Sequence, residues 1–129
     1  MSLLFTRFPG LVGRLPFRPL GQFPTALEPL RGLCSSRVDL WVKREDQAGT
    51  LYGGNKVRKL ELLLGGIGDQ KPAMVQDERP RLLTLGAWGS NHALAVALYG
   101  QSLGLRVDTV LFPQPLTVET APYLQRQLA

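Results

Sequence analysis

A lysine that begins a short predicted helix is the residue best suited to covalent chemistry in this sequence. Asn55 is a favourable N-cap, because its side-chain oxygen can accept a hydrogen bond from a first-turn N–H group. Lys56 then lies in the first turn, where the positive end of the helix dipole disfavours an ammonium group. A neutral amine is what attack on an aldehyde requires, so Lys56 is a candidate for Schiff-base chemistry. Taken alone, the pattern favours the alternative that Lys56, Arg58 and Lys59 form a solvated helix face.

Two glycine-containing turns each precede candidate site residues. Gly53-Gly54 precedes Asn55 and would let the backbone come close to a ligand. Gly86-Ala87-Trp88-Gly89 follows a predicted strand, and Ser90 and Asn91 then begin a helix. Ligands of α/β sheets collect at the carboxyl ends of strands, and a helix N-terminus offers N–H groups to an anion such as a carboxylate. Ser90 and Asn91 are also ordinary capping residues that need no ligand.

Two aromatic side chains near the second turn are less informative. His92 falls in the first turn of the helix, where a packed or partly exposed histidine is favoured over a catalytic one. Trp88 fits a core position or an active-site wall equally well. The spacing Gly-x-x-Gly lacks the third glycine of the dinucleotide-binding fingerprint.

Hydrophobic spacing predicts the elements that position these turns. A helix over Lys56–Leu64 places Val57, Leu60, Leu63 and Leu64 on one face, directs Arg58 and Glu61 elsewhere, and ends at Gly65-Gly66 as at a C′ glycine. A strand, a helix and a strand within about thirty residues form a βαβ unit, so its strands are parallel. The expected segments are a strand at Asp39–Arg44, a polar loop at Glu45–Gly54, a polar connection at Gln70–Arg79, strands at Arg81–Leu85 and Arg106–Phe112, a helix from Ser90 to Leu103 ended by Gly104, and a further helix within Thr117–Ala129 with Pro122 near its start.

Composition and charge exclude several classes of protein. The 129 residues are 44% hydrophobic and 19% charged, which is typical of one globular domain, and no apolar run reaches the ~18 residues of a membrane span. One cysteine, Cys34, and one histidine are too few for a disulfide framework or a structural zinc site, so no metal is expected. We expect a cytoplasmic protein that binds neither membrane nor nucleic acid.

Residues 1–37 form a proline-rich basic arm. They carry five of the ten prolines and a net charge of +4 out of +5, so the basic excess is not on a folded face as in most nucleic-acid binders. The prolines predict an extended lead-in over residues 1–30 that packs over the rest of the protein, not a long helix. A targeting peptide is disfavoured because the arm is poor in serine and lacks a clean amphipathic helix.

Taken together, the two loops resemble a known enzyme family. The run Gly53-Gly54-Asn55-Lys56-Val57-Arg58-Lys59-Leu60-Glu61, preceded by Leu40-Trp41-Val42-Lys43-Arg44-Glu45-Asp46, resembles the lysine region of 1-aminocyclopropane-1-carboxylate (ACC) deaminases and D-cysteine desulfhydrases. Thr84-Leu85-Gly86 with Ser90-Asn91-His92 matches the second loop of that family, and Pro24–Leu30 its lead-in. The resemblance covers roughly residues 20–112. These are tryptophan-synthase-β-like (fold type II) enzymes that use pyridoxal 5′-phosphate (PLP).

The resemblance implies roles for three residues. Lys56 matches the lysine that bonds to the cofactor and later moves protons. Asn91 matches the residue that bonds to the 3′-oxygen of the cofactor. Ser90 matches a catalytic serine that meets the substrate carboxylate. The implied activity is a PLP-dependent lyase or deaminase that acts on a small amino acid, releases ammonia and a 2-oxo acid, and forms a homodimer at full length.

The sequence also departs from the family. Where the family has Gly-Gly-x-Gln-Ser-Asn, this chain has Gly86-Ala87-Trp88-Gly89-Ser90-Asn91, which puts the identity of the substrate in doubt. The phosphate-binding loop, the partner of the pyridine nitrogen and the active-site tyrosines of the family lie further along the chain than Ala129. We therefore expect an α/β fold that is an incomplete fold type II PLP enzyme: a parallel βαβ unit with an extended N-terminal arm, in which residues 38–129 are the N-terminal part of a truncated enzyme.

Three hypotheses follow from these observations. The first is the N-terminal part of a PLP-dependent lyase or deaminase, whose 129 residues alone bind PLP poorly and are inactive. The second is a truncated, non-catalytic fragment of such an enzyme, which predicts no stabilisation by ligand. The third is a basic nucleic-acid-binding module, which predicts salt-dependent binding that is lost with residues 1–37.

Overall fold

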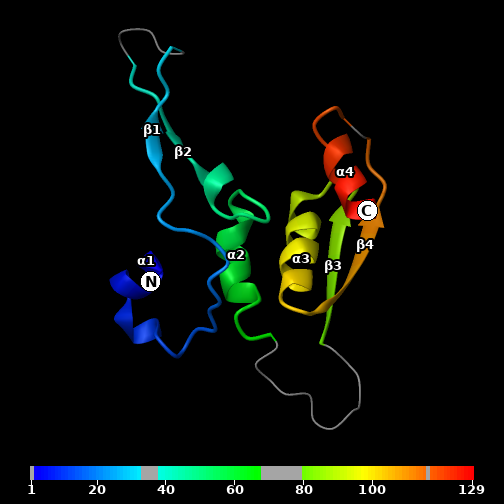
Figure 1. The fold of residues 1–129 in the computed structure, drawn as a ribbon, viewed down its shortest axis with the longest axis horizontal. Coiled ribbons are helices and arrows are strands. Elements are labelled where there is room, and N and C mark those ends of the chain that lie inside the picture. Colours follow the sequence, from blue (N-terminus) through cyan, green and yellow to red (C-terminus); the bar gives the residue numbers. More distant parts are fainter. Residues whose placement is uncertain (1, 33–37, 68–79, 116) are drawn as a thin grey trace.

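Two parallel strands and the helix that connects them form the carboxy-terminal part of the molecule (Figure 1). The computed structural model describes residues 2–32, 38–67, 80–115 and 117–129. The polar connection expected at Gln70–Arg79 and the cysteine Cys34 lie outside the described residues. In chain order the elements are α1 (Leu3–Arg7), a 3-10 turn (Pro9–Leu11), β1 (Leu27–Pro29), β2 (Trp41–Lys43), a 3-10 turn (Glu45–Gln47), α2 (Lys56–Leu63), β3 (Arg81–Ala87), α3 (Asn91–Ser102), β4 (Arg106–Phe112) and α4 (Ala121–Leu128).

The βαβ unit confirms the parallel pair that the sequence predicts. β3 and β4 pair in parallel from Arg81 opposite Arg106 to Ala87 opposite Phe112. α3 runs between them and packs against both strands. Its first turn is capped by Ser90, whose Oγ accepts a hydrogen bond from the backbone N–H of Ala93 at 3.3 Å. The helix is followed by Gly104, which has a φ of 76° and so supplies the left-handed residue that ends many helices.

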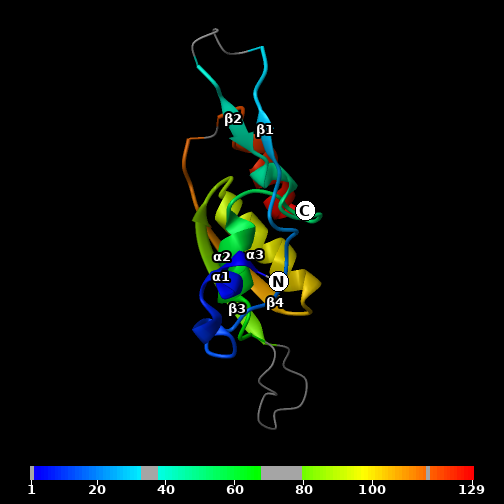
Figure 2. The ribbon, with the colours of Figure 1, turned by 90° about the vertical axis from the view of Figure 1, so that its left-hand side faces the viewer.

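α2 packs on the side of α3 that faces away from the sheet, so α3 is the central layer (Figures 1 and 2). This position explains why α3 is buried around most of its circumference. Leu63 was expected on the buried face of α2, but its side chain is 61% exposed, whereas the expected outward residue Glu61 is only 5% exposed. Glu61 is buried because the N-terminal arm covers a second side of α2. The core between the two helices consists of Ala48, Val57, Leu60, Leu64, Ala95, Val96 and Tyr99.

The arm follows α2 and is held to it, and to the end of the 3-10 turn before it, by backbone hydrogen bonds. Arg18 N donates to the carbonyl oxygen of Glu61 at 2.8 Å, and Gln22 N donates to that of Ala48 at 2.8 Å. Gly65 does not take the positive φ expected of a C′ glycine. Instead a Cβ at this position would lie 2.5 Å from the backbone nitrogen of Phe17, so the absence of a side chain lets the arm cross closely.

A short antiparallel hairpin extends from the helices (Figure 1). β1 pairs with β2 from Leu27 opposite Lys43 to Pro29 opposite Trp41. The strand predicted over Asp39–Arg44 is therefore present but shorter, and its partner lies in a segment that the sequence predicted only as extended. Within the described residues, no helix has the length and apolar character needed to cross a membrane.

Candidate active site

The first turns of α2 and α3 lie at the same end of the two packed helices. The two helices pack side by side and run in the same direction, and α3 begins just beyond the carboxyl end of β3 (Figure 1). Lys56 is the first residue of α2, while Ser90 caps α3 and Asn91 is its first residue. The fold therefore brings the three predicted site residues to one end of the helical layer, although Lys56 is more than thirty positions away from the other two in the sequence.

Lys56 is half-buried, and its amine points back to the preceding residue. Its Nζ donates a hydrogen bond to Oδ1 of Asn55 at 3.1 Å. The expected capping bond from Asn55 is absent, because Asn55 already has helical backbone angles (φ −65°, ψ −13°) and its side-chain oxygen receives the lysine amine instead. An N-cap side chain normally reaches the backbone from an extended conformation. Asn55 therefore orients the amine and does not cap the helix.

The two glycines before Asn55 are required by the chain itself. A Cβ at Gly53 would lie 1.9 Å from the carbonyl oxygen of Asp46, and Gly54 has a φ of 93°. The loop can close on the 3-10 turn only with glycine at the first position, and the second needs a left-handed conformation that other residues rarely adopt. Besides the close approach to a ligand that the sequence suggests for them, these two glycines are therefore needed for the path of the chain itself.

A tyrosine on α3 fixes the middle of the same loop. Tyr99 Oη donates a hydrogen bond to the carbonyl oxygen of Tyr52 at 2.7 Å. Gly49 leaves room for this contact, because a Cβ there would lie 2.2 Å from the Tyr99 hydroxyl oxygen. Burial raises the pKa of both tyrosines, so both phenols remain protonated near neutral pH. The loop that leads to Lys56 is thus attached to the central helix.

The residues of the β3–α3 turn differ in their exposure. Asn91 is exposed and His92 is half-buried. Trp88 is 36% exposed, which does not fit a core position. Gly89 is buried with a φ of 75°, and a Cβ there would lie 2.6 Å from the carbonyl oxygen of Thr120. The segment before α4 therefore packs where a larger residue would need space, which gives a structural reason for glycine at this position.

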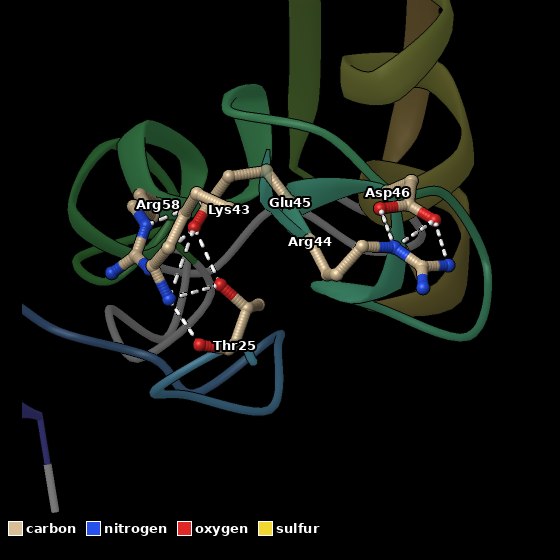
Figure 3. Close-up of polar contacts among 6 residues, drawn as sticks. All are labelled: Thr25, Lys43, Arg44, Glu45, Asp46 and Arg58. Atoms are coloured by element: carbon tan, nitrogen blue, oxygen red, sulfur yellow. Dashed lines mark hydrogen bonds and ion pairs between the residues drawn. The ribbon is translucent and has the colours of Figure 1, made fainter. Parts of the chain in front are cut away.

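A charged cluster around the carboxylate of Glu45 was not identified from the sequence. The carboxylate of Glu45 accepts two hydrogen bonds from Arg58, from Nε and from Nη2, each at 2.8 Å (Figure 3). Thr25 Oγ1 donates to the same carboxylate at 2.7 Å, and Lys43 Nζ lies 3.9 Å from it. Hydrogen bonds from Arg58 and then Thr25 lower the pKa of Glu45 from 4.5 to about 2. Arg58 is thus a structural partner of Glu45, not only part of a solvated helix face.

The signal for this cluster was present in the sequence. The acidic pair Glu45-Asp46 and the basic run from Lys56 to Lys59 stand on either side of a glycine-containing loop. Opposite charges at the two ends of a loop can pair when the loop folds back, but the sequence does not show which acid meets which base. In the structure Asp46 turns away and pairs with Arg44 at 2.8 Å (Figure 3).

Comparison with known proteins finds an epimerase and several ACC deaminases. The chain is 41% identical over 103 residues to nocardicin C-9′ epimerase of Nocardia uniformis subsp. tsuyamanensis, a match that covers 80% of this chain and 29% of that protein. It is 35% identical over 97 residues to the ACC deaminase of Burkholderia multivorans, covering 72% of this chain and 27% of the relative. No family model matches the sequence.

A solved structure agrees with these sequence relatives. A crystal structure described as an ACC deaminase homologue superposes with a TM-score of 0.65 and 30% sequence identity, and the match covers 99% of this chain and 36% of that one. Over these residues the chain is similar in sequence and in fold to ACC deaminases. Its α/β fold is accordingly an incomplete version of the ACC deaminase homologue fold, with the parallel strand pair in place. The chain spans roughly 30% of the length of the curated relatives that it matches.

Proposed function

We propose that a protein containing these residues is a PLP-dependent lyase or deaminase that acts on a small amino acid and releases ammonia and a 2-oxo acid. The observation that carries the proposal is the placement of Lys56 and of the Ser90-Asn91 pair at adjacent helix starts. The homology to ACC deaminases supports it. Substrates of the ACC deaminase and D-cysteine desulfhydrase types are the two candidates.

The residues at this end fit the chemistry of PLP. Lys56 offers a primary amine for the aldehyde carbon, and the exposed amide of Asn91 can donate a hydrogen bond to the 3′-oxygen of the cofactor. The first N–H groups of α2 and α3 favour an anionic group at the same end. When bound, PLP supplies an electron sink for charge that develops on the substrate.

The side chains of this chain supply binding and proton transfer. Lys56 would hold the cofactor through Nζ, and once a substrate amine has displaced it, the free amine would be able to carry a proton to or from the α-carbon of that substrate. Asn55 Oδ1 accepts from this amine and so limits its orientation. Ser90 Oγ accepts from Ala93 N, and a hydroxyl can donate as well as accept, so capping is compatible with a bond to the substrate carboxylate.

Chemical trapping tests the role of Lys56. The chain is incubated with excess PLP and reduced with borohydride, and the modified lysine is located by peptide mass spectrometry. We expect modification mainly at Lys56, and we expect Lys56→Ala to remove it while Lys59→Ala, one helical turn away, leaves it in place. Modification of the four lysines in proportion to their exposure would contradict the proposal.

A product assay tests the reaction type. The relatives include an epimerase as well as deaminases, so the products are measured directly. We expect ammonia and a 2-oxo acid from ACC or from D-cysteine in a longer protein that contains these residues, because residues 1–129 alone are expected to be inactive. Inversion of an amino acid at its α-carbon without release of ammonia would favour an epimerase instead.

A further inference from the structure

Glu45 holds the chain on both sides of Lys56. Its carbonyl oxygen accepts a hydrogen bond from the backbone N–H of Gly54, two residues before the lysine. Its carboxylate accepts both hydrogen bonds from Arg58, two residues after the lysine. We infer that Glu45 is a positioning residue that fixes the root of the Lys56 side chain, an inference that rests on the proposed function.

Several contacts make this attachment stiff. The paired bonds from Nε and Nη2 use the planar fork of arginine, a geometry that lysine cannot reproduce. The guanidinium of Arg58 bonds to Glu45 through its edge, and one of its faces lies over the ring of Phe23, with 4.0 Å between Cζ and the ring centroid. Thr25 adds a third donor to the carboxylate, whose side chain is 23% exposed. The arm, the 3-10 turn and α2 therefore meet at one carboxylate.

A stiff attachment matters because lysine has a long, flexible side chain. Four methylene groups let the amine sample many positions, and a reacting group must be held near its target geometry for efficient bond formation. Gly54 and Arg58 fix the backbone on either side, and Asn55 Oδ1 receives the amine itself at 3.1 Å. Loss of the Glu45–Arg58 pair would make the first turn of α2 more mobile, so that the amine of Lys56 would sample a wider range of positions.

The neighbouring acid offers a matched control. Asp46 lies in the same 3-10 turn, and its carboxylate pairs with Arg44, not with α2. Its side chain is 61% exposed. Asp46→Asn therefore removes a carboxylate and an ion pair next to Glu45 without touching the first turn of α2.

The test compares the reactivity of two lysines within one molecule. Glu45→Gln, Arg58→Lys and Asp46→Asn chains are treated with PLP and borohydride, and the ratio of modification at Lys56 to that at Lys59 is measured by mass spectrometry. Circular dichroism and thermal melting confirm that each chain is folded. We expect the ratio to fall roughly three- to ten-fold in Glu45→Gln and Arg58→Lys and to stay unchanged in Asp46→Asn.

The outcomes separate this inference from the proposed function. If the unaltered chain shows no preference for Lys56, the proposed function fails and the inference fails with it. If the unaltered chain prefers Lys56 and the folded Glu45→Gln and Arg58→Lys chains keep the same ratio, only the positioning role is wrong. Should Glu45→Gln not fold, Arg58→Lys decides the question, because it leaves Glu45 and its bond to Gly54 in place.

Discussion

The carboxylate of Glu45 connects charge to stability at the scale of single residues. Arg58 and Thr25 bond to its ionised form, so the folded chain holds the pKa near 2 while an unfolded chain returns it to 4.5. A group whose pKa is lower in the folded state stabilises the fold above its unfolded pKa, and that contribution is lost as the pH falls toward the folded pKa. The same direction holds for Asp46, whose pKa is lowered by Arg44.

The pH dependence of unfolding follows from this sign. We expect the free energy of unfolding to decrease as the pH falls from about 4.5 to about 2, since protons must bind carboxylates that are paired in the folded state. Glu45→Gln should flatten this decrease more than Asp46→Asn, because the Asp46 pair is more exposed and better screened. Urea unfolding at a series of pH values measures both. An equal slope in the chain with and without Glu45 would show that the pair does not stabilise the fold.

At the scale of elements, the arm and α2 are joined by the buried carboxylate of Glu61. Its Oε1 accepts hydrogen bonds from the backbone N–H groups of Leu20 at 3.1 Å and Gly21 at 3.3 Å. The side chain is 5% exposed, so these two donors compensate for much of the water that it loses. A helix position that looks solvent-facing in the sequence is thus the attachment point of a segment some forty residues away.

Removal of this carboxylate should loosen the arm. We expect Glu61→Ala to lower the free energy of unfolding by about 1–3 kcal/mol, because two N–H groups lose their acceptor. Trypsin should then cut faster after Arg14, which is followed by Leu15. The control is Glu119→Ala, which removes an exposed glutamate and should change stability by less than about 0.5 kcal/mol. Unchanged proteolysis of the arm in Glu61→Ala would show that other contacts hold it.

How far the sequence predicts the elements depends on the range of the interactions involved. The limits of β4 and the identity of α3 follow from local hydrophobic spacing and from caps such as Ser90 and Gly104, so they were predicted well. The burial of Glu61 and the pairing of Glu45 with Arg58 depend on segments that meet only in the folded chain. Periodicity cannot show a second covered face of α2, and it cannot show which acid pairs with which base.

The candidate site shows the same division. Lys56, Ser90 and Asn91 were found from their places at predicted helix starts, and the fold brings those starts to one end. The capping role of Asn55 was predicted wrongly, because the lysine amine competes for its side-chain oxygen. The roles of the three residues toward PLP remain predictions.

At the scale of the whole molecule, one face of the parallel strand pair is not covered by the described residues. α3 packs on the other face, while the burial of β3 and β4 alternates along each strand. Parallel sheets are normally covered on both faces, and their strands are apolar for that reason. The exposed apolar side chains on this face are Leu83 (63%), Leu85 (64%), Val110 (51%) and Phe112 (56%).

This face should bind a hydrophobic dye. Leu85 and Val110 are partners in the strand register, so Leu85→Lys places a charge at the centre of the apolar face and should reduce the fluorescence of bound anilinonaphthalene sulfonate. The control is Leu63→Lys on α2, where an equally exposed leucine lies outside this sheet face and should matter little. Because Leu85 is already exposed, its substitution should leave the melting temperature nearly unchanged. Equal dye fluorescence in the two variants would mean that the apolar face is covered in solution, by a second copy or by a rearrangement of the chain.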